Sequence, residues 1–598
     1  MSACSILIVS IFTDVTFRKY MKGLMTCGLI MAVLFSSFVF TKAQRVPEKL
    51  DAYNEPPSRL RGVIEKFSED HGSLERFYTS KTSSNRAAAL RGLYDERLTF
   101  LSDQNFATLN HDEQIDYLLF RNYLEHEKAE LARSQSQLVE MASIIPFAGT
   151  ISDLEDSRRK LEPVDAAKTA QQLTELARQI KSTRRTFEDE KTAKPKRTVA
   201  NRSVRTIASL RLTLRNWYNF YNAYDPAFSW WNAEPYKSVE DALQNYSTFV
   251  VQKLVGIDPD DKVTIIGDPI GRDALLKELE YEMVPYTPEE LVELANKEFA
   301  WCEAEMKKAS REMGYGDDWK KALEAVKQRY VEPGKQPELI KKFSFEAIDY
   351  IEQISLVTVP KLARETWRME MMSPERQLVA PFFLGGETIL VAYPTSGMTH
   401  EQKMMSMRGN NPHFAHATVH HELIPGHHLQ GYMTQRYRPY RKMFHTPFWM
   451  EGWALYWEFL LWDKGFNKTP EDRIGALFWR MHRCARIIFS LSFHLEKMSP
   501  QQAVDFLVER VGHERDNASA EVRRSFSGDY GPLYQIAYMI GGLQFYRLHR
   551  DLVDSKRMTD RAFHDAILKE GPIPVEMVRA ILTGEKLTAR KKPAWRFY

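Results

Sequence analysis

Residues 420–430 constrain this 598-residue chain more than any other stretch, because a proline and a glycine interrupt a cluster of histidines there. His421 and Glu422 begin like the pattern His-Glu-x-x-His, in which two imidazoles four residues apart on a helix share a metal and the glutamate points at its bound water. Here Pro425 holds the fifth position, and the next histidine is His427. In an unbroken helix, six residues separate two side chains by about 240° and about 9 Å along the axis. One ion could not bind both.

The intervening Pro425 and Gly426 offer a way to bring the two histidines together. Proline removes a backbone hydrogen bond and clashes with the preceding turn, and glycine tolerates the distorted backbone that results. Helical bulges of this kind are frequent at functional sites. We therefore predict a kink or bulge that returns His427 to the face of His421.

Other histidine pairings are possible in this stretch. His416 and His420 have the cleaner spacing of four, but no acid follows His416 to activate a water. His421 and His428 share a face of a straight helix yet lie about 10 Å apart along it. A histidine-rich helix that binds nothing is the simplest alternative. Two histidines, the adjacent Glu422 and an acid further along favour a metal site.

A third ligand is expected because zinc in hydrolases takes three protein ligands and leaves one position for water. Glu451 and Glu458 follow the histidines and are seven residues apart, so both lie near one face of a predicted helix. Spacing leaves the choice between these two carboxylates open. Histidine and carboxylate ligands suit Zn²⁺ and also accommodate Mn²⁺ or Co²⁺.

Several motifs in the last third of the chain resemble one family. Residues 421–430 and 451–456 resemble the motifs His-Glu-x-x-Pro-Gly-His-His-x-Gln and Glu-Gly-Trp-Ala-Leu-Tyr of the family catalogued as domain of unknown function 885, which is grouped with the gluzincin metallopeptidases. Residues 521–524 and 532–541 resemble its Glu-Val-x-Arg and Pro-x5-Tyr-x-x-Gly segments. The resemblance covers roughly residues 50–595.

The resemblance implies roles for individual residues. The family's matching glutamate begins its motif, which makes Glu451 the third metal ligand and leaves Glu458 to orient a ligand histidine or to form a salt bridge. Gluzincins commonly use a tyrosine or histidine beyond the third ligand as an oxyanion donor, which implies Tyr538, although a buried aromatic side chain is the alternative. Tyr534 stands where the family often has glutamine, so this chain offers a hydroxyl instead of an amide at that position.

Residue chemistry suggests further roles around the predicted metal. Glu422 is the predicted general base, which takes a proton from the water that attacks the scissile carbonyl and passes it to the leaving amine. Arg524 could bind a substrate carboxylate bidentately, although a structural ion pair is the common fate of arginine. His420 and His428 flank the ligands, and we expect them to orient water or substrate from an outer position.

Apolar residues at three-and-four spacing predict that the chain is mainly helical. Thr287, Pro288 and Glu290 form a helix start with a capping box, and that helix should run to about Met313. Another helix is expected over residues 345–372, kinked by Pro360. The resemblance to gluzincins implies a two-lobed helical architecture, with a small β-sheet beside the helix that bears the predicted metal ligands.

One strand is expected over residues 387–394, where β-branched and apolar residues follow two glycines and precede a proline. In gluzincins an edge strand beside the zinc aligns the substrate backbone, because an edge presents unpaired N–H and C=O groups. By that analogy the strand, including Tyr393, would bind substrate. A structural hairpin arm is the alternative.

The N-terminal segment is predicted to be a signal peptide of residues 1–43. Basic residues precede a charge-free, mainly apolar run from Leu24 to Phe40, and Ala43 is the predicted cleavage site. Met21 is the likelier start, because Met21-Lys22 opens an ordinary signal peptide. An uncleaved membrane anchor is the alternative. Residues 44–598 are then a single helical metallopeptidase-like domain with two lobes.

Composition narrows the classes of partner. The formal net charge of +3 gives no case for nucleic acid or for a charged membrane surface. Only Cys302 and Cys484 lie outside the targeting segment, which excludes a disulfide scaffold and leaves at most one bridge. We expect both to be buried as small apolar residues.

Together these features predict an exported zinc peptidase, periplasmic or secreted, that hydrolyses short or unfolded peptides. Its only membrane contact would be through the signal or anchor segment, and exopeptidase and endopeptidase action both stay open. A non-catalytic helical binding protein of the cell envelope is the competing class. A metal-dependent amidase acting on non-peptide substrates is a third possibility.

Overall fold

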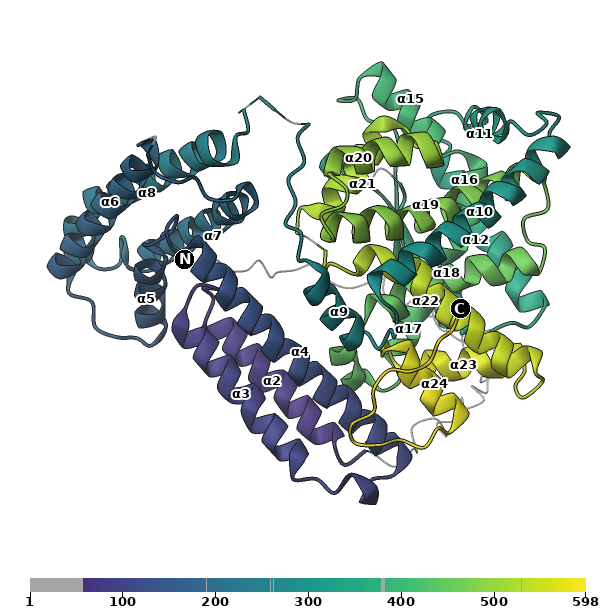
Figure 1. The fold of residues 1–598 in the computed structure, drawn as a ribbon, viewed down its shortest axis with the longest axis horizontal. Helices are drawn as coiled ribbons and strands as arrows, with labels where there is room; N and C mark the ends of the chain where they lie inside the picture. Colours follow the sequence, from purple (N-terminus) through teal and green to yellow (C-terminus); the bar gives the residue numbers. More distant parts are fainter. Residues whose placement is uncertain (1–57, 190, 259, 262, 378–381, 529) are drawn as a thin grey trace, which may run out of the picture. The chain divides into compact units, whose positions relative to one another are not determined.

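The computed structural model describes residues 58–598, apart from 190, 259, 262, 378–381 and 529. Helices are the main elements of this part of the chain (Figure 1), as the apolar periodicity predicts. The predicted signal peptide lies outside the described residues. Within them, no helix combines the length and apolar character that a membrane crossing needs.

The secondary-structure elements in the first half of the described chain are all helices. Its elements are α2 (Arg61–Phe77), α3 (Ser84–Ser102), η2 (Phe106–Thr108), α4 (His111–Met141), α5 (Ala148–Arg159), α6 (Ala166–Glu188), α7 (Arg197–Tyr221), α8 (Pro226–Phe249), η3 (Val250–Val255), α9 (Arg272–Tyr281), α10 (Pro288–Glu312) and α11 (Trp319–Lys327). Helix α10 begins with the predicted capping box of Thr287 and Glu290 and ends one residue before the predicted Met313, so this prediction is confirmed.

The second half adds two short strands to the helices. Its elements are α12 (Gln336–Gln353), α13 (Lys361–Thr366), β1 (Arg368–Met371), α14 (Pro374–Gln377), β2 (Thr388–Val391), α15 (His400–Gly409), α16 (Pro412–Glu422), α17 (His427–Thr434), η4 (Pro439–Phe444), α18 (Pro447–Asp463), α19 (Pro470–His494), α20 (Pro500–Phe506), η5 (Leu507–Val511), α21 (Arg515–Phe526), α22 (Tyr534–His549), η6 (Arg550–Asp554), α23 (Asp560–Glu570) and α24 (Val575–Thr583).

Two sequence predictions for this half need correction. The single kinked helix predicted over residues 345–372 is wrong, because α12 ends at Gln353 and the chain continues as a short helix and then as strand β1. The predicted strand is present as β2, but the outer edge of β2 is partly occupied. Strand β2 pairs in parallel with β1, and Leu384 forms an antiparallel bridge with Leu390 on β2. The outer position beside β2 therefore belongs to the segment that contains Leu384.

Buried apolar side chains form three clusters within the compact unit of residues 58–598. One draws on α2–α4, α12, α17, α23 and α24, a second on α10, α11, α19 and α22, and a third on α5–α8. Helix α18 contributes to the first two, because it is buried on nearly all sides. Cys302 and Cys484 are free and buried in the second cluster, as expected.

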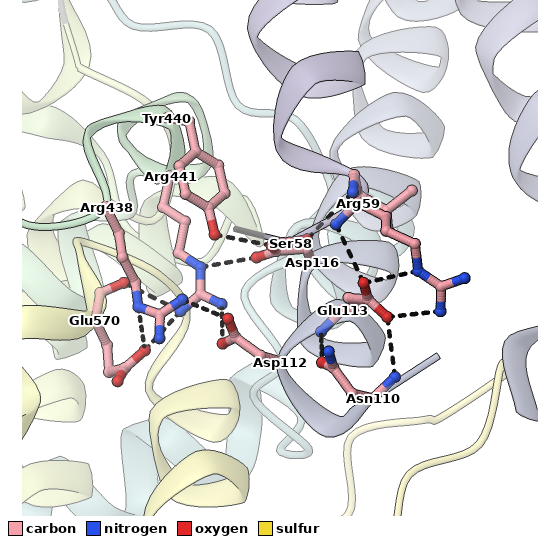
Figure 2. Close-up of polar contacts among 11 residues, drawn as sticks. Ser58, Arg59, Asn110, Asp112, Glu113, Asp116, Arg438, Tyr440, Arg441 and Glu570 are labelled. Atoms are coloured by element: carbon pink, nitrogen blue, oxygen red, sulfur yellow. Dashed lines mark hydrogen bonds and ion pairs between the residues drawn. The ribbon is translucent and has the colours of Figure 1, made fainter. Parts of the chain in front are cut away.

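A buried ion network fixes η4 to the start of α4 (Figure 2). The guanidinium group of Arg441 is fully buried and contacts Asp116 Oδ1 and Asp112 Oδ1, each at 2.8 Å, and Glu570 Oε2 at 2.6 Å. Tyr440 donates its hydroxyl to Asp116 Oδ2 at 2.8 Å. Burial alone would raise the pKa of Asp112, but the adjacent arginines lower it overall.

We predict that Arg441→Ala destabilises the fold by about 3–5 kcal/mol, because it leaves buried carboxylates without their cation. Urea unfolding would measure the change. Arg184→Ala is the matched control, since Arg184 forms an exposed pair with Glu188 and should cost less than about 1 kcal/mol. Equal effects of the two substitutions would refute a structural role for the network.

A second buried acid lies beneath the start of α18. Thr446 caps this helix by accepting from the Phe448 N–H at 3.1 Å, and its hydroxyl donates to Glu282 Oε2. Glu282 is buried, and its burial raises the pKa of the carboxyl to about 8 despite this hydrogen bond. The carboxyl group is therefore neutral in the folded protein at pH 6–7.

This raised pKa predicts a pH-dependent stability. Below about pH 4.5 both folded and unfolded states carry the Glu282 proton, and as pH rises to about 8 only the unfolded state loses it. Stability should fall across that window by up to about 1.4 kcal/mol per pH unit from this group. Glu282→Gln should reduce the fall, measured as unfolding free energy at pH 5 and pH 8. An unchanged difference between the two pH values would contradict the prediction.

Candidate metal centre

The predicted interruption of the histidine helix is present, but it is a complete break rather than a bulge. Helix α16 ends at Glu422 and α17 begins at His427. Between them the Gly426 N–H donates to the carbonyl of His420 at 2.9 Å. A β-carbon on Gly426 would lie 1.8 Å from the carbonyl oxygen of His421, so only glycine fits this turn. The break lets α17 leave in a new direction and carries His427 towards His421.

His421, His427 and Glu451 converge on one point. Glu451 Oε2 lies 3.6 Å from His421 Nε2 and 3.3 Å from His427 Nε2, and the three ligand atoms are all within 4.8 Å of one another. Tetrahedral ligand atoms 2.0–2.1 Å from a zinc ion lie about 3.3–3.4 Å apart. Glu451 Oε2 is buried and accepts no hydrogen bond from any described residue. The set therefore fits a divalent ion bound through the Nε2 atoms and this oxygen.

The remaining atoms of the three side chains are held by other residues. His421 Nδ1 lies 2.8 Å from Glu458 Oε1, and His427 Nδ1 lies 3.2 Å from Gln430 Oε1. Hydrogen bonds at Nδ1 leave Nε2 of each ring free for a metal and fix the orientation of the ring. Tyr534 donates its hydroxyl to the second oxygen of Glu451. Glu458 lies where the resemblance implies.

The charges of His427 and Glu451 influence each other strongly. Burial lowers the pKa of His427, but the Glu451 carboxylate outweighs it and raises that pKa to about 9. Burial likewise acts to raise the pKa of Glu451, yet the two histidines hold it well below its usual range. The carboxylate thus stays ionised beside positive charge. The two imidazoles supply that charge when they are protonated, and a divalent cation bound by the neutral imidazoles would supply it in their place.

Two glycines allow α18 and α22 to cross at close range and bring Glu451 to its partners. A β-carbon on Gly452 would lie 2.5 Å from the backbone of Gly541, and one on Gly541 would lie 2.0 Å from the carbonyl oxygen of Phe448. Tyr534 and Tyr538 precede Gly541 by seven and three residues, so all three lie near one face of α22. The crossing therefore places both tyrosines beside Glu451.

Helix α18 also holds the helix break in place. The indole N–H of Trp453 donates to the carbonyl oxygen of Pro425 at 2.8 Å, and Trp453 is fully buried. Gln430 donates to the Met450 carbonyl at 3.0 Å while it contacts His427. One helix therefore supplies the third ligand, Glu451, and positions the segment that bears the other two.

A cavity of about 640 Å³ opens over the centre. Its lining includes His421, His427 and Glu451 together with Glu422 and Tyr538. The negative charge of Glu422 contributes to the raised pKa of both histidines, so its carboxylate lies near both ligands. The ring of Tyr538 stacks at 6.2 Å from that of His421, and burial raises the pKa of its hydroxyl to about 12.

The Gly385-Gly386 segment forms the wall beside Glu422. The Gly386 N–H donates to the carbonyl of Glu422 at 2.9 Å, and a β-carbon on Gly385 would lie 2.1 Å from the same oxygen. Gly385 and Gly386 line the cavity, whereas Tyr393 is not among the described residues that do. The Tyr393 N–H instead bonds Gln377 at 3.1 Å. Any backbone contact with a ligand would involve this glycine segment rather than Tyr393.

The other predicted site residues divide into two groups. Arg524 lines the cavity and also contacts Glu521, with Nε 3.2 Å from Oε2. His428 points away from the centre, because its Nε2 lies 2.8 Å from the carbonyl oxygen of Ala363. The expected outer-position role of His428 is therefore not supported by its contacts. Gln430 and Tyr534 occupy such positions instead. Both residues lie in or beside the motifs that resemble the family, but neither the motifs nor the spacing assigned them a contact with a candidate ligand.

The rival histidine pairings are not brought together as ligands. Within the described residues, His421, His427 and Glu451 form one potential ligand group and His126, Glu130 and Glu278 form the other. His420 is buried without a partner at either ring nitrogen, and burial holds its pKa well below the usual range. It is therefore a neutral core residue.

The second group, His126, Glu130 and Glu278, is paired with a cationic side chain of the protein, Arg133. Arg133 forms ion pairs with both Glu130 and Glu278, and it lies 3.2 Å from Glu278 Oε1. His126 bonds the other oxygen of Glu278 at 3.2 Å and stacks on Tyr281 at 3.7 Å. These acids are neutralised within the protein and form a structural ion network.

A comparison with known protein families identifies the family to which this chain belongs. The family model described as bacterial protein of unknown function (DUF885) matches residues 70–582, so the chain belongs to this family. No curated protein matches the sequence.

Two solved structures share the fold at low sequence identity. A "putative lipoprotein of unknown function" from Shewanella oneidensis is 15% identical, with a TM-score of 0.66, over 87% of this chain and 98% of that one. A "putative lipoprotein" from Colwellia psychrerythraea is 14% identical, with a TM-score of 0.56, over 88% of this chain and 98% of that one. At these identities the likeness extends to the fold alone.

We predict that Gly541→Ala destabilises the protein by about 1–3 kcal/mol or more and weakens zinc binding at least tenfold. The added methyl group would clash with the Phe448 carbonyl and displace α22 from α18, together with the contacts around Glu451. Urea unfolding and competitive zinc titration would measure the two effects. Gly92→Ala is the control, because no atom would contact the new methyl group and exposed helical alanine is favoured. Zinc affinity equal to wild type in Gly541→Ala would exclude the proposed role of the crossing.

Proposed function

We propose that this protein is an exported zinc-dependent peptidase that hydrolyses short or unfolded peptides. The convergence of two imidazole nitrogens on the unpaired, buried oxygen of Glu451 carries this proposal, because the spacing fits tetrahedral zinc ligation. The motif resemblance to gluzincins supports the peptidase class. The likeness of the fold to two proteins described as putative lipoproteins, together with the predicted signal peptide, supports export.

The ligand set suggests what chemistry the centre performs. A zinc ion bound by His421, His427 and Glu451 would polarise a substrate carbonyl and lower the pKa of a water molecule. Mn²⁺ or Co²⁺ could occupy the same ligands. Three protein ligands leave a position open towards the cavity, where Glu422 lies.

Proton transfer is assigned to Glu422. Its carboxylate takes a proton from the attacking water as the new C–O bond forms, and then gives that proton to the leaving nitrogen as the C–N bond breaks. The products are a carboxylic acid and an amine. Glu422 suits this role because it lines the cavity close to both ligand histidines.

Tyr538 is assigned to the oxyanion of the tetrahedral intermediate. Tyr534 already donates its hydroxyl to Glu451, which leaves Tyr538 as the tyrosine of this pair with a hydroxyl to offer the substrate. Its raised pKa keeps the hydroxyl protonated at neutral pH, so it can donate a hydrogen bond. A hydrogen bond that strengthens as negative charge develops lowers the barrier.

Two other classes of function compete with this one. A non-catalytic binding protein of the cell envelope could retain a metal for stability, and a metal-dependent amidase could act on non-peptide substrates. Glu422 beside the ligands favours catalysis over the first class, because a structural zinc site needs no base. Products formed from peptide and non-peptide amides would separate the second class from a peptidase.

We predict that Glu422→Gln retains zinc but lowers kcat for peptide hydrolysis by about 10²–10⁴-fold, since it removes the base and not a ligand. Metal content by mass spectrometry and digestion of a peptide library would measure the two properties. His427→Ala should lose both zinc and activity.

Glu387→Gln is the matched control, because Glu387 is an exposed acid paired with Arg368 and should leave both properties unchanged. Undiminished cleavage by Glu422→Gln would remove the proposed base. Zinc binding without hydrolysis of any library member by the wild type would favour the non-catalytic class.

A further inference from the structure

Three arginines gather in one wall of the cavity, beside Tyr538. Arg483 and Arg486 lie on α19, one turn apart, and Arg524 lies on α21. All three line the cavity. Their guanidinium groups come from two different helices, so the tertiary fold concentrates this charge.

The acidic groups beside these arginines do not balance them. Glu521 lies between two of the three, with Oε1 2.7 Å from Arg486 Nε and Oε2 3.2 Å from Arg524 Nε. The carboxylate nearest to Arg483 is Glu458 at 3.8 Å, and that group also bonds His421. The wall therefore carries more positive than negative charge.

Three guanidinium nitrogens of these arginines are buried without hydrogen-bond partners among the described residues. Arg486 Nη1, Arg483 Nε and Arg524 Nε donate no hydrogen bond to any described residue. The side chains of Arg486 and Arg483 are only 5% and 6% exposed. Burial and the neighbouring Arg486 lower the pKa of Arg483. Unpaired buried donors cost free energy, and an anion that enters the cavity would recover it.

The position of this wall limits which part of a ligand it can contact. The Tyr538 ring lies 6.2 Å from the imidazole of His421, with the guanidinium carbons of Arg486 and Arg483 at 4.4 and 4.8 Å from the same ring. One aromatic side chain thus separates the arginines from the metal ligands. A peptide covers such a span with about one to three extended residues, at about 3.4 Å each.

We infer that Arg483 and Arg486 bind a carboxylate of the peptide substrate, one to three residues beyond the scissile bond on its C-terminal side. This inference rests on the proposed peptidase function and assigns its substrate class: peptides that end close to the cleaved bond. The α-carboxylate of the C-terminus and an acidic side chain share the required chemistry. Arginine matches either one, because its planar fork donates two parallel hydrogen bonds to a carboxylate.

Binding to an inactive protein tests the inference without relying on turnover. The probe is a library of N-acetylated tripeptides, prepared as free acids and as C-terminal amides, and incubated with zinc-loaded Glu422→Gln protein. Mass spectrometry of the bound fraction gives relative affinities. We expect free acids to bind at least tenfold more tightly than the matching amides. Equal binding of the two forms, or binding of neither, would overturn the inference.

Single substitutions test whether Arg483 and Arg486 cause the preference for free acids over amides. In the same protein, Arg483→Gln and Arg486→Lys should each reduce the acid-to-amide ratio towards one while amide binding stays unchanged. Arg486→Lys keeps a cation for Glu521, so a loss of selectivity there reports geometry rather than an unpaired acid. Arg376→Gln is the control, since Arg376 is an exposed arginine lining the same cavity and should leave the ratio unchanged. Selectivity that survives both test substitutions would exclude these two arginines.

Amides with a glutamate or aspartate side chain distinguish the two sources of carboxylate. If they bind as tightly as free acids, the arginines recognise an acidic side chain; if they bind as weakly as other amides, the α-carboxylate is the ligand. Digestion of the same peptides by the zinc-loaded wild type separates this inference from the proposed function. Selective binding without hydrolysis would refute the peptidase and keep the carboxylate site. Equal hydrolysis of acids and amides would refute the site alone.

Discussion

The close crossing of α18 and α22 is the contact on which the candidate metal centre depends. Gly452 and Gly541 face each other there, and neither position has room for a β-carbon. Because Glu451 precedes one glycine and Tyr538 lies one turn before the other, the crossing sets their separation. Larger residues would move the helices apart and break the hydrogen bond from Tyr534 to Glu451. Backbone proximity therefore fixes the side-chain chemistry.

The break between α16 and α17 is the second constraint, and it works only in combination with α18. Local chemistry ends the first helix, since Pro425 cannot continue it and Gly426 alone fits beneath the His421 carbonyl. Local interactions do not determine the direction of α17. The Trp453 indole binds the Pro425 carbonyl and Gln430 binds the α18 backbone, so α18 directs His427 towards Glu451.

Charge in the cavity is divided between two neighbouring regions. At the centre, Glu451 and Glu422 provide negative charge near two histidines, which suits a divalent cation. On the adjoining wall, arginines exceed acids, which suits an anion. Tyr538 lies between the two regions, in contact with both. A peptide that places a carbonyl at one region and a carboxylate at the other would match both.

The helical character of the chain, the capped start of α10 and an interruption of the histidine helix could be predicted from the sequence alone. These features depend on interactions among residues a few positions apart, such as the Thr287–Glu290 capping box. The sequence also identified which residue types could ligate a metal. Tertiary packing set the pairing of Leu384 with β2, the contact of His428 with Ala363, and the contacts of Gln430 and Tyr534 with the candidate ligands. Tyr534 and Glu451 are 83 residues apart, and no periodicity spans that separation. Their contact exists because two helices with small residues at one point can pack backbone to backbone.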